Sequence, residues 1–156
     1  MIVLTPPSSN SIENAISWAV SHVGNSSYVT IDNKTKYSID PSTGIGNCAN
    51  FVANTYGEPS YGYNSAIDLW NSTTINKHSG DINAPRGCLV FFDYSPYGHV
   101  ALCLGDGEIV EAGGKSNIRE STISADNVGG LTYLGWAWPP SSWPGRLVGL
   151  TNPINP

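Results

Sequence analysis

The sequence predicts a single domain of the α+β class, in which N-terminal helices pack on a central antiparallel sheet. Apolar residues recur at helical spacing in residues 12–23 and again in residues 48–56, which predicts two amphipathic helices. Short apolar runs bounded by turn-forming residues follow at 89–92 and 99–104, which predicts strands. Gly105-Asp106-Gly107 directly after the second run favours a tight hairpin, and hence antiparallel pairing.

The composition narrows the possible classes of function. The chain has 156 residues, enough for one domain with a sizeable core. Only 12% of residues are charged and the formal net charge is −5, so a nucleic-acid partner, which selects a basic face, is not expected. No apolar run approaches the roughly 20 residues of a membrane span, and the first residues lack the basic segment of a signal peptide. We therefore expect no membrane partner and no export signal.

The first helix is expected to start at Asn10, which can act as N-cap with Glu13 at the third helical position. Gly24-Asn25 is expected to end it. Its apolar stripe predicts the face that packs on the core, and consists of Ile12, Ala15, Ile16, Ala19, Val20 and Val23.

The second helix places a thiol at its start. Residues 25–46 are expected to form a loop, Asn47 is a good N-cap, and Gly57 with Pro59 stops the helix. Cys48 then lies in the first helical turn, where backbone N–H groups and the helix dipole favour thiolate over thiol. The chain has three cysteines without paired spacing, so Cys48, Cys88 and Cys103 are all expected to be reduced.

The remaining elements follow in order. A short helix capped by Asn64 or Ser65 turns three apolar residues inward, and a polar connection over 71–86 leads to the strand at 89–92. In the next strand, alternation places His99 on the same face as Ala101 and Cys103. After the hairpin, residues 108–112 return antiparallel, and residues 133–138 form the last strand. We expect the domain to cover residues 1–143, and residues 144–156 to be a tail or the start of a linker.

A thiol at the start of a helix becomes a nucleophile when a base lies beside it, and His99 is the natural base. The pair can cleave amide bonds, because the imidazolium protonates the leaving amine. Glu111 follows His99 by 12 positions, an even offset across a short hairpin that allows both side chains onto one face, so Glu111 can orient the imidazole. The alternative for Glu111 is an exposed carboxylate at the rim.

Other residues are candidates for the oxyanion hole or for substrate binding. The backbone N–H of Cys48 can contribute, as can the side chain of Asn47 or a hydroxyl from Tyr28 or Tyr37. Trp138 either stacks on a glycan or closes the core.

Metal chemistry and serine chemistry are not indicated. The three histidines are scattered without metal-ligand spacing, and G-x-S-x-G is absent. The loop around Asp32 and Asp40 lacks the alternating acidic pattern of a calcium site. We expect no metal and no cofactor.

Several motifs together resemble a known family. They are Cys48 at a helix start after a turn-rich loop, the strand Gly87-Cys88-Leu89-Val90-Phe91-Phe92, and the run from His99-Val100-Ala101 through Gly105-Asp106-Gly107 to Glu111-Ala112. This pattern covers roughly residues 10–138 and resembles the NlpC/P60 and CHAP group of papain-like cysteine amidohydrolases and peptidases. In NlpC/P60 members, a second histidine usually stands where this chain has Glu111.

The resemblance implies a papain-like fold and a peptidoglycan hydrolase that cuts an amide bond. The bond lies either within the stem peptide or cross-bridge, or between muramic acid and L-alanine. The expected partner is bacterial peptidoglycan, and the best fit is the catalytic domain of a phage endolysin, made in the host cytoplasm and acting on the cell wall. The alternatives are an antibacterial effector, an acyltransferase with the same residue pair, and a non-catalytic wall-binding module.

Overall fold

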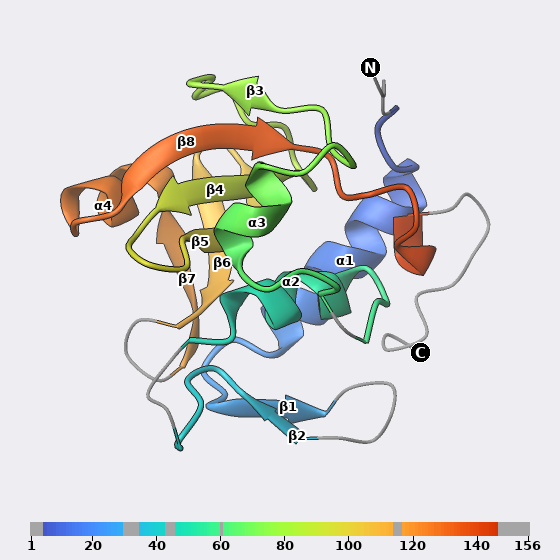
Figure 1. Cartoon of the computed structure of the whole chain (residues 1–156). Coiled ribbons are helices and arrows are strands. Elements are labelled where there is room, and N and C mark those ends of the chain that lie inside the picture. Colours follow the sequence, from blue (N-terminus) through green and yellow to red (C-terminus); the bar gives the residue numbers. More distant parts are fainter. Residues whose placement is uncertain (1–4, 30–34, 43–45, 60, 114–116, 147–156) are drawn as a thin grey trace.

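A six-stranded antiparallel sheet with helices on both faces forms the domain (Figure 1). The computed structural model describes residues 5–29, 35–42, 46–59, 61–113 and 117–146. The strands in their order across the sheet are β3 (His78–Ser79), β8 (Thr132–Ala137), β4 (Leu89–Asp93), β5 (His99–Gly105), β6 (Glu108–Ala112) and β7 (Ile118–Thr122). The predicted α+β class, with N-terminal helices on an antiparallel sheet, is confirmed.

The helices divide between the two faces of the sheet. α1 (Ser9–Ser21), α2 (Cys48–Thr55) and α3 (Ala66–Trp70) cover one face, and α2 packs directly on β5 and β6. α4 (Ile123–Val128) contacts both β7 and β8, which lie near opposite edges of the sheet, so the sheet curves around it. No helix in the described part of the chain is long and apolar enough to cross a lipid bilayer.

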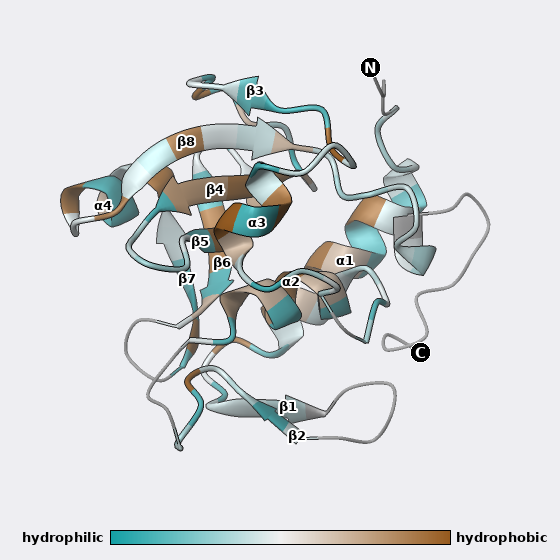
Figure 2. Ribbon diagram, viewed as in Figure 1, coloured by the Kyte–Doolittle hydropathy of each residue, from teal (hydrophilic) through white to brown (hydrophobic). Residues whose placement is uncertain are grey.

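Both faces of the central strands are buried. Alternate residues of β4, β5 and β6 point into the cluster under α1 to α3, and the residues between them point into a second cluster closed by Ile123 and Trp136. Figure 2 shows β4 as a hydrophobic band in the middle of the sheet. Burial on both faces explains why residues 89–92 form a continuous apolar run rather than an alternating one.

The first helix starts earlier and faces differently than the sequence suggested. Its N-cap is Ser8 and not Asn10, because the Ser8 hydroxyl accepts a hydrogen bond of 3.1 Å from the backbone N–H of Ser11. Val20 and Val23 are 41% and 39% exposed, whereas Trp18 is buried. The helix is rotated so that Trp18, rather than the two valines, faces the core, since an indole removes more apolar area from water than a valine.

Short strands occupy segments that were expected to be loops. β1 (Ser27–Val29) and β2 (Thr35–Tyr37) form a separate hairpin, and β3 pairs with β8. β7 and α4 were also not anticipated. β1, β2 and β3 have only two or three residues each, which is too short to show a periodicity in the sequence.

The start of the predicted tail packs on the helices. Residues 144–146 form a 3₁₀ turn, η1, whose Gly145 N–H donates a hydrogen bond of 2.6 Å to the Tyr56 carbonyl. Residues 147–156 and Asp32 lie outside the described residues. The boundary at residue 143 stays a prediction.

Gly135 in β8 gives the first test, because β3 crosses it closely. A Cβ at this position would lie 2.3 Å from the His78 carbonyl oxygen, and the residue has φ +144°. Gly135→Ala should lower the free energy of unfolding by about 3 kcal/mol, measured by urea denaturation. Gly80→Ala, at φ +72° with open space around it, should cost only about 1 kcal/mol. Equal losses in the two variants would show that β3 does not pack on β8 as described.

Candidate active site

The loop before α2 fixes Cys48 at the start of the helix. The backbone N–H of Asn47 donates to the Ser38 carbonyl at 2.9 Å, and its side-chain amide donates to the Tyr37 carbonyl at 2.6 Å. Asn47 is the N-cap residue, but its side chain makes no capping hydrogen bond. Its amide therefore anchors the loop to the β1–β2 hairpin, and Cys48 becomes the first helical residue.

His99 is the first residue of β5, held in place by the turn before it. Gly98 has φ +72°, and a Cβ there would meet Ile67 of α3 at 3.0 Å, so the position requires glycine. The backbone N–H of Ile67 also donates to the Tyr97 carbonyl at 3.0 Å. Helix α3 thus secures the turn that presents the imidazole.

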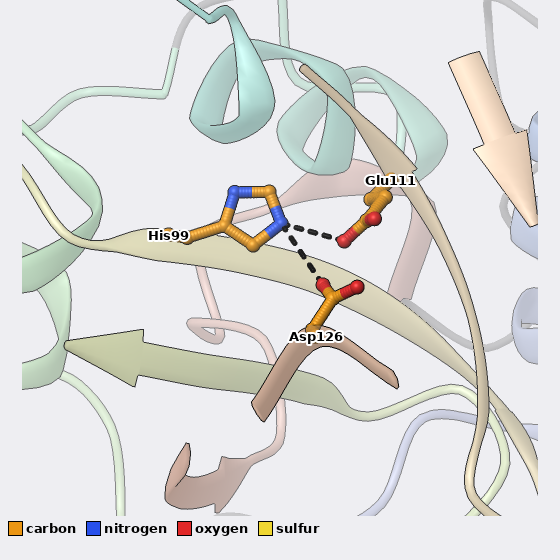
Figure 3. A group of neighbouring side chains, drawn as sticks. All are labelled: His99, Glu111 and Asp126. Carbon is orange, nitrogen blue, oxygen red and sulfur yellow. Dashed lines mark hydrogen bonds and ion pairs between the residues drawn. The ribbon is translucent and has the colours of Figure 1, made fainter. Parts of the chain in front are cut away.

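The hairpin between β5 and β6 brings Glu111 to His99. Val110 pairs with Leu102, which puts Glu111 and His99 on the same face of the sheet, diagonally across the two strands. Nε2 of His99 lies 2.7 Å from Oε1 of Glu111 (Figure 3). The Glu111 side chain is only 2% exposed, which excludes the alternative of a rim carboxylate.

The thiol of Cys48 meets the imidazole from the other side. It is hydrogen bonded to His99 and to the backbone N–H groups of Ala49 and Val100. Burial opposes the thiolate, but the charge of His99 and these hydrogen bonds outweigh it and lower the pKa of Cys48. The structure thus brings Cys48, His99 and Glu111 into one hydrogen-bonded chain.

The pKa values of His99 and Glu111 are shifted in directions that also favour their charged forms. Burial favours neutral imidazole, but the negative Cys48 and Glu111 side chains overcome it and raise the pKa of His99 to about 10. Burial likewise opposes the charge of Glu111, but hydrogen bonds from His99 and other donors lower its pKa. All three shifts favour a thiolate–imidazolium pair that is held by a carboxylate.

The remaining candidates differ in their burial and in their contacts. Tyr28 is 3% exposed, and its pKa is raised by burial and by the charge of nearby Cys48. Its hydroxyl has no hydrogen-bond partner among the described residues, so it is free to bind an oxyanion. Tyr37 is 43% exposed, and only its backbone carbonyl accepts the hydrogen bond from the Asn47 side chain. Trp138 packs on Trp136 in the second core cluster.

Three residues of the site were not anticipated from the sequence. Arg119 on β7 donates from Nε to Oε2 of Glu111 at 2.8 Å, and Asp126 on α4 lies 3.8 Å from Nε2 of His99. Tyr61 is buried close enough to Cys48 for the charge there to add to the effect of burial, which raises the pKa of Tyr61. None of the three stands in a local pattern that predicts a place in the site.

His99, Glu111 and Asp126 are also a set of possible metal ligands, since one donor atom from each lies within 4.8 Å of the others. Arg119, however, already bonds Glu111 and lies 3.6 Å from Asp126. A metal ion would have to displace this guanidinium from both carboxyl groups. The geometry therefore favours a hydrogen-bonded cluster over a metal site.

A hollow opens beside the residue that precedes the thiol. Its volume is about 360 Å³, and polar residues line most of it. The lining residues are Thr35, Lys36, Tyr37, Asp40, Pro41, Ser42 and Asn47. It offers space for a polar ligand next to the start of α2.

No protein-family model and no curated protein matches the sequence, but solved structures match the fold. An NLP/P60-family protein described as similar to lipoprotein, from Staphylococcus aureus, aligns with a TM-score of 0.58 at 19% identity over 86% of this chain; the chain spans only 43% of that protein. The peptidoglycan hydrolase RipB from Mycobacterium tuberculosis aligns with a TM-score of 0.58 at 21% identity, over 86% of this chain and 73% of that one. RipD from the same organism, a non-catalytic NlpC/p60 domain protein adapted to peptidoglycan binding, aligns with a TM-score of 0.54 at 20% identity, over 82% and 98%. The fold is therefore that of NlpC/P60 domains.

The electrostatics of the thiol predict selective alkylation. Iodoacetamide should modify Cys48 at pH 7 much faster than Cys88 or Cys103, which are fully buried. Because the pKa of Cys48 is lowered, the rate should fall at a lower pH than the alkylation rate of an ordinary thiol does. His99→Ala removes the imidazolium and should slow alkylation at pH 7 about tenfold or more. Peptide mapping by mass spectrometry measures both rates; equal labelling of the three cysteines would refute the assignment.

Proposed function

We propose that this protein is a peptidoglycan hydrolase that cleaves an amide bond by thiol chemistry. The observation that carries the proposal is the chain from Cys48 at a helix start, through His99, to the buried Glu111. The scissile bond lies in the stem peptide or cross-bridge, or between N-acetylmuramic acid and L-alanine. The shared fold with RipB supports this class of substrate.

The geometry gives each residue a step in the reaction. The Cys48 thiolate attacks the carbonyl carbon, and the oxyanion that forms is bound by the N–H groups of the first turn of α2 and the Tyr28 hydroxyl. The imidazolium of His99 then protonates the nitrogen of the leaving amine, and the acyl group stays on sulfur as a thioester. Water adds to the thioester, gives its proton to His99, and releases the carboxylic acid and the thiolate.

Glu111 keeps the imidazole productive throughout the cycle. Its carboxylate accepts a hydrogen bond from Nε2, which leaves Nδ1 for the exchange of the proton with sulfur and substrate. Its negative charge also stabilises the imidazolium that is present before the amine leaves and that forms again when water attacks the thioester.

Peptidoglycan binding without hydrolysis is the second candidate function. It is favoured by the fold shared with RipD, which is described as non-catalytic. The contacts that link Cys48, His99 and Glu111 in this chain support hydrolysis instead.

The biological setting that fits best is the catalytic part of a phage endolysin, made in the host cytoplasm and acting on the cell wall. The net charge of −5 gives the domain no long-range attraction to an anionic wall. A separate wall-binding domain would supply it, since tethering raises the effective concentration of substrate.

The products of digestion test the proposed reaction. Purified peptidoglycan should yield new amino termini or freed lactyl groups and no new reducing sugars, because a Cys–His pair attacks acyl carbons. Mass spectrometry of the muropeptides measures this, with EDTA present to exclude a contaminating metalloenzyme. Cys48→Ser should be folded and inactive. If the wild type binds peptidoglycan but releases no fragments, the binding function replaces the proposal.

The role of Glu111 can be separated into orientation and charge. Glu111→Gln retains an acceptor for Nε2 but loses the charge, whereas Glu111→Ala loses both. We expect kcat on peptidoglycan to fall about 10- to 100-fold in Glu111→Gln, and by about three to four powers of ten in Glu111→Ala. Glu108→Gln, at an exposed position of the same strand, is the matched control. If both Glu111 variants turn over like wild type, Glu111 has no part in the reaction.

A further inference from the structure

A second carboxyl group lies behind the imidazole of His99. Asp126, on α4, is 3% exposed, and its Oδ2 atom lies 3.8 Å from Nε2 of His99. Figure 3 shows Asp126 and Glu111 on the same side of the ring, both directed at Nε2. Glu111 alone makes the short contact, at 2.7 Å. Asp126 is therefore not the direct partner of the imidazole and needs another explanation.

The two oxygens of Asp126 have different surroundings. Oδ1 accepts a hydrogen bond of 2.8 Å from the Ser121 hydroxyl and lies 3.6 Å from the Arg119 guanidinium. Oδ2 is completely buried and receives no hydrogen bond from the described residues. A carboxylate oxygen in that position would be desolvated without a hydrogen bond, which is costly.

The balance of charge in the cluster also disfavours an ionised Asp126. Two anions, the Cys48 thiolate and Glu111, are offset by two cations, the His99 imidazolium and Arg119. A third anion on Asp126 would leave the buried cluster with a net negative charge. A proton on Asp126 avoids this charge.

A protonated Asp126 also solves the problem of the unpaired oxygen. Two carboxylates cannot bond to each other, since both only accept, whereas a carboxyl group can donate its O–H to a carboxylate. A carboxyl oxygen of Asp126 lies within 4.8 Å of one of Glu111, and the two groups affect each other as hydrogen-bond partners. Burial, then Glu111, raises the pKa of Asp126, while Ser121 and His99 oppose the shift.

Each strand around Asp126 contributes a group to this balance of charges or directs its polar group elsewhere. β5 contributes His99, β6 contributes Glu111, and β7 contributes Arg119. On β8, which also packs on α4, the Tyr133 hydroxyl turns away and donates to the Asp81 carbonyl at 2.6 Å. No further charged group of the described residues faces Oδ2.

We infer that Asp126 is a protonated positioning residue, which donates a hydrogen bond from Oδ2 to Glu111 and thereby holds the carboxylate that orients His99. Glu111 then receives three donors: His99, Arg119 and Asp126. The inference deepens the proposed function, on which its catalytic meaning rests. The ionisation of the Cys48 thiol and the protonation of the Asp126–Glu111 pair can both be measured without peptidoglycan.

Two substitutions at position 126 distinguish a neutral donor from an anion. Asp126→Asn keeps the size and can donate an N–H to Glu111, whereas Asp126→Leu keeps the branching at Cγ but has no donor. With a protonated Asp126, the alkylation rate of Cys48 by iodoacetamide at pH 6 should stay within about twofold of wild type in Asp126→Asn and fall about fivefold or more in Asp126→Leu. If Asp126 acts as an anion, both variants should be equally slow.

Infrared spectroscopy observes the proton directly. At pH 6, where exposed carboxyl groups are ionised, the wild type should show the carbonyl stretch of a protonated carboxyl group, and Asp126→Asn should lack it. Asp106→Asn is the matched control, since it makes the same carboxyl-to-amide change at an exposed turn position with φ 54° that asparagine tolerates; the band should remain.

The outcomes are distinct. The inference is overturned if the infrared band is missing in wild type, if Asp126→Asn is as slow as Asp126→Leu, or if both variants react like wild type. Should Asp126→Leu fail to fold, as judged by circular dichroism, the comparison of Asp126→Asn with wild type and the infrared band still decide. A protein that fails to digest peptidoglycan but shows the band and the expected alkylation rates would lose the proposed function and keep this inference.

Discussion

The register between β5 and β6 is the constraint on which the site depends. Because side chains alternate between the two faces of a strand, a slip of one residue would move Glu111 away from His99 to the opposite face of the sheet. The pairing of Leu102 with Val110 prevents this slip, and the apolar residues on both faces enforce the pairing. The core and the site are therefore specified together: the contacts that bury the sheet also set the 2.7 Å hydrogen bond to the imidazole.

The curvature of the sheet has a chemical consequence as well. It brings α4 against both β7 and β8, so Asp126 reaches the cluster from one side while Arg119 reaches it from β7. Buried charges are tolerated only when they compensate one another. In this cluster each anion has a cation beside it. We therefore expect a substitution at any one member to change the reactivity of the Cys48 thiol.

The sequence was informative where the signal was local. Cys48, His99 and Glu111 were each visible from a short stretch: a helix start, a strand start, and an even offset across a hairpin. Asp126 was not, because α4 has six residues and its approach to His99 depends on how the whole sheet curves. Tyr28 was only one of two tyrosine candidates, since the three-residue strand β1 carries no periodic signal. Burial of Trp18 in place of Val20 likewise follows from side-chain size against a core that the sequence does not display.

The same fold is shared by a peptidoglycan hydrolase and by a protein described as non-catalytic, so the fold alone does not decide the activity of this chain. What decides it is whether the thiol is ionised at neutral pH. Helix position alone gives a modest preference for thiolate, whereas an adjacent imidazolium held by a buried carboxylate gives a strong one. In this chain the imidazolium is held by Glu111, and Glu111 is held in turn by donors from two further elements. An arrangement that keeps a thiolate next to a proton donor costs burial energy and gives a binding module nothing, so its presence is the strongest physical argument for hydrolysis.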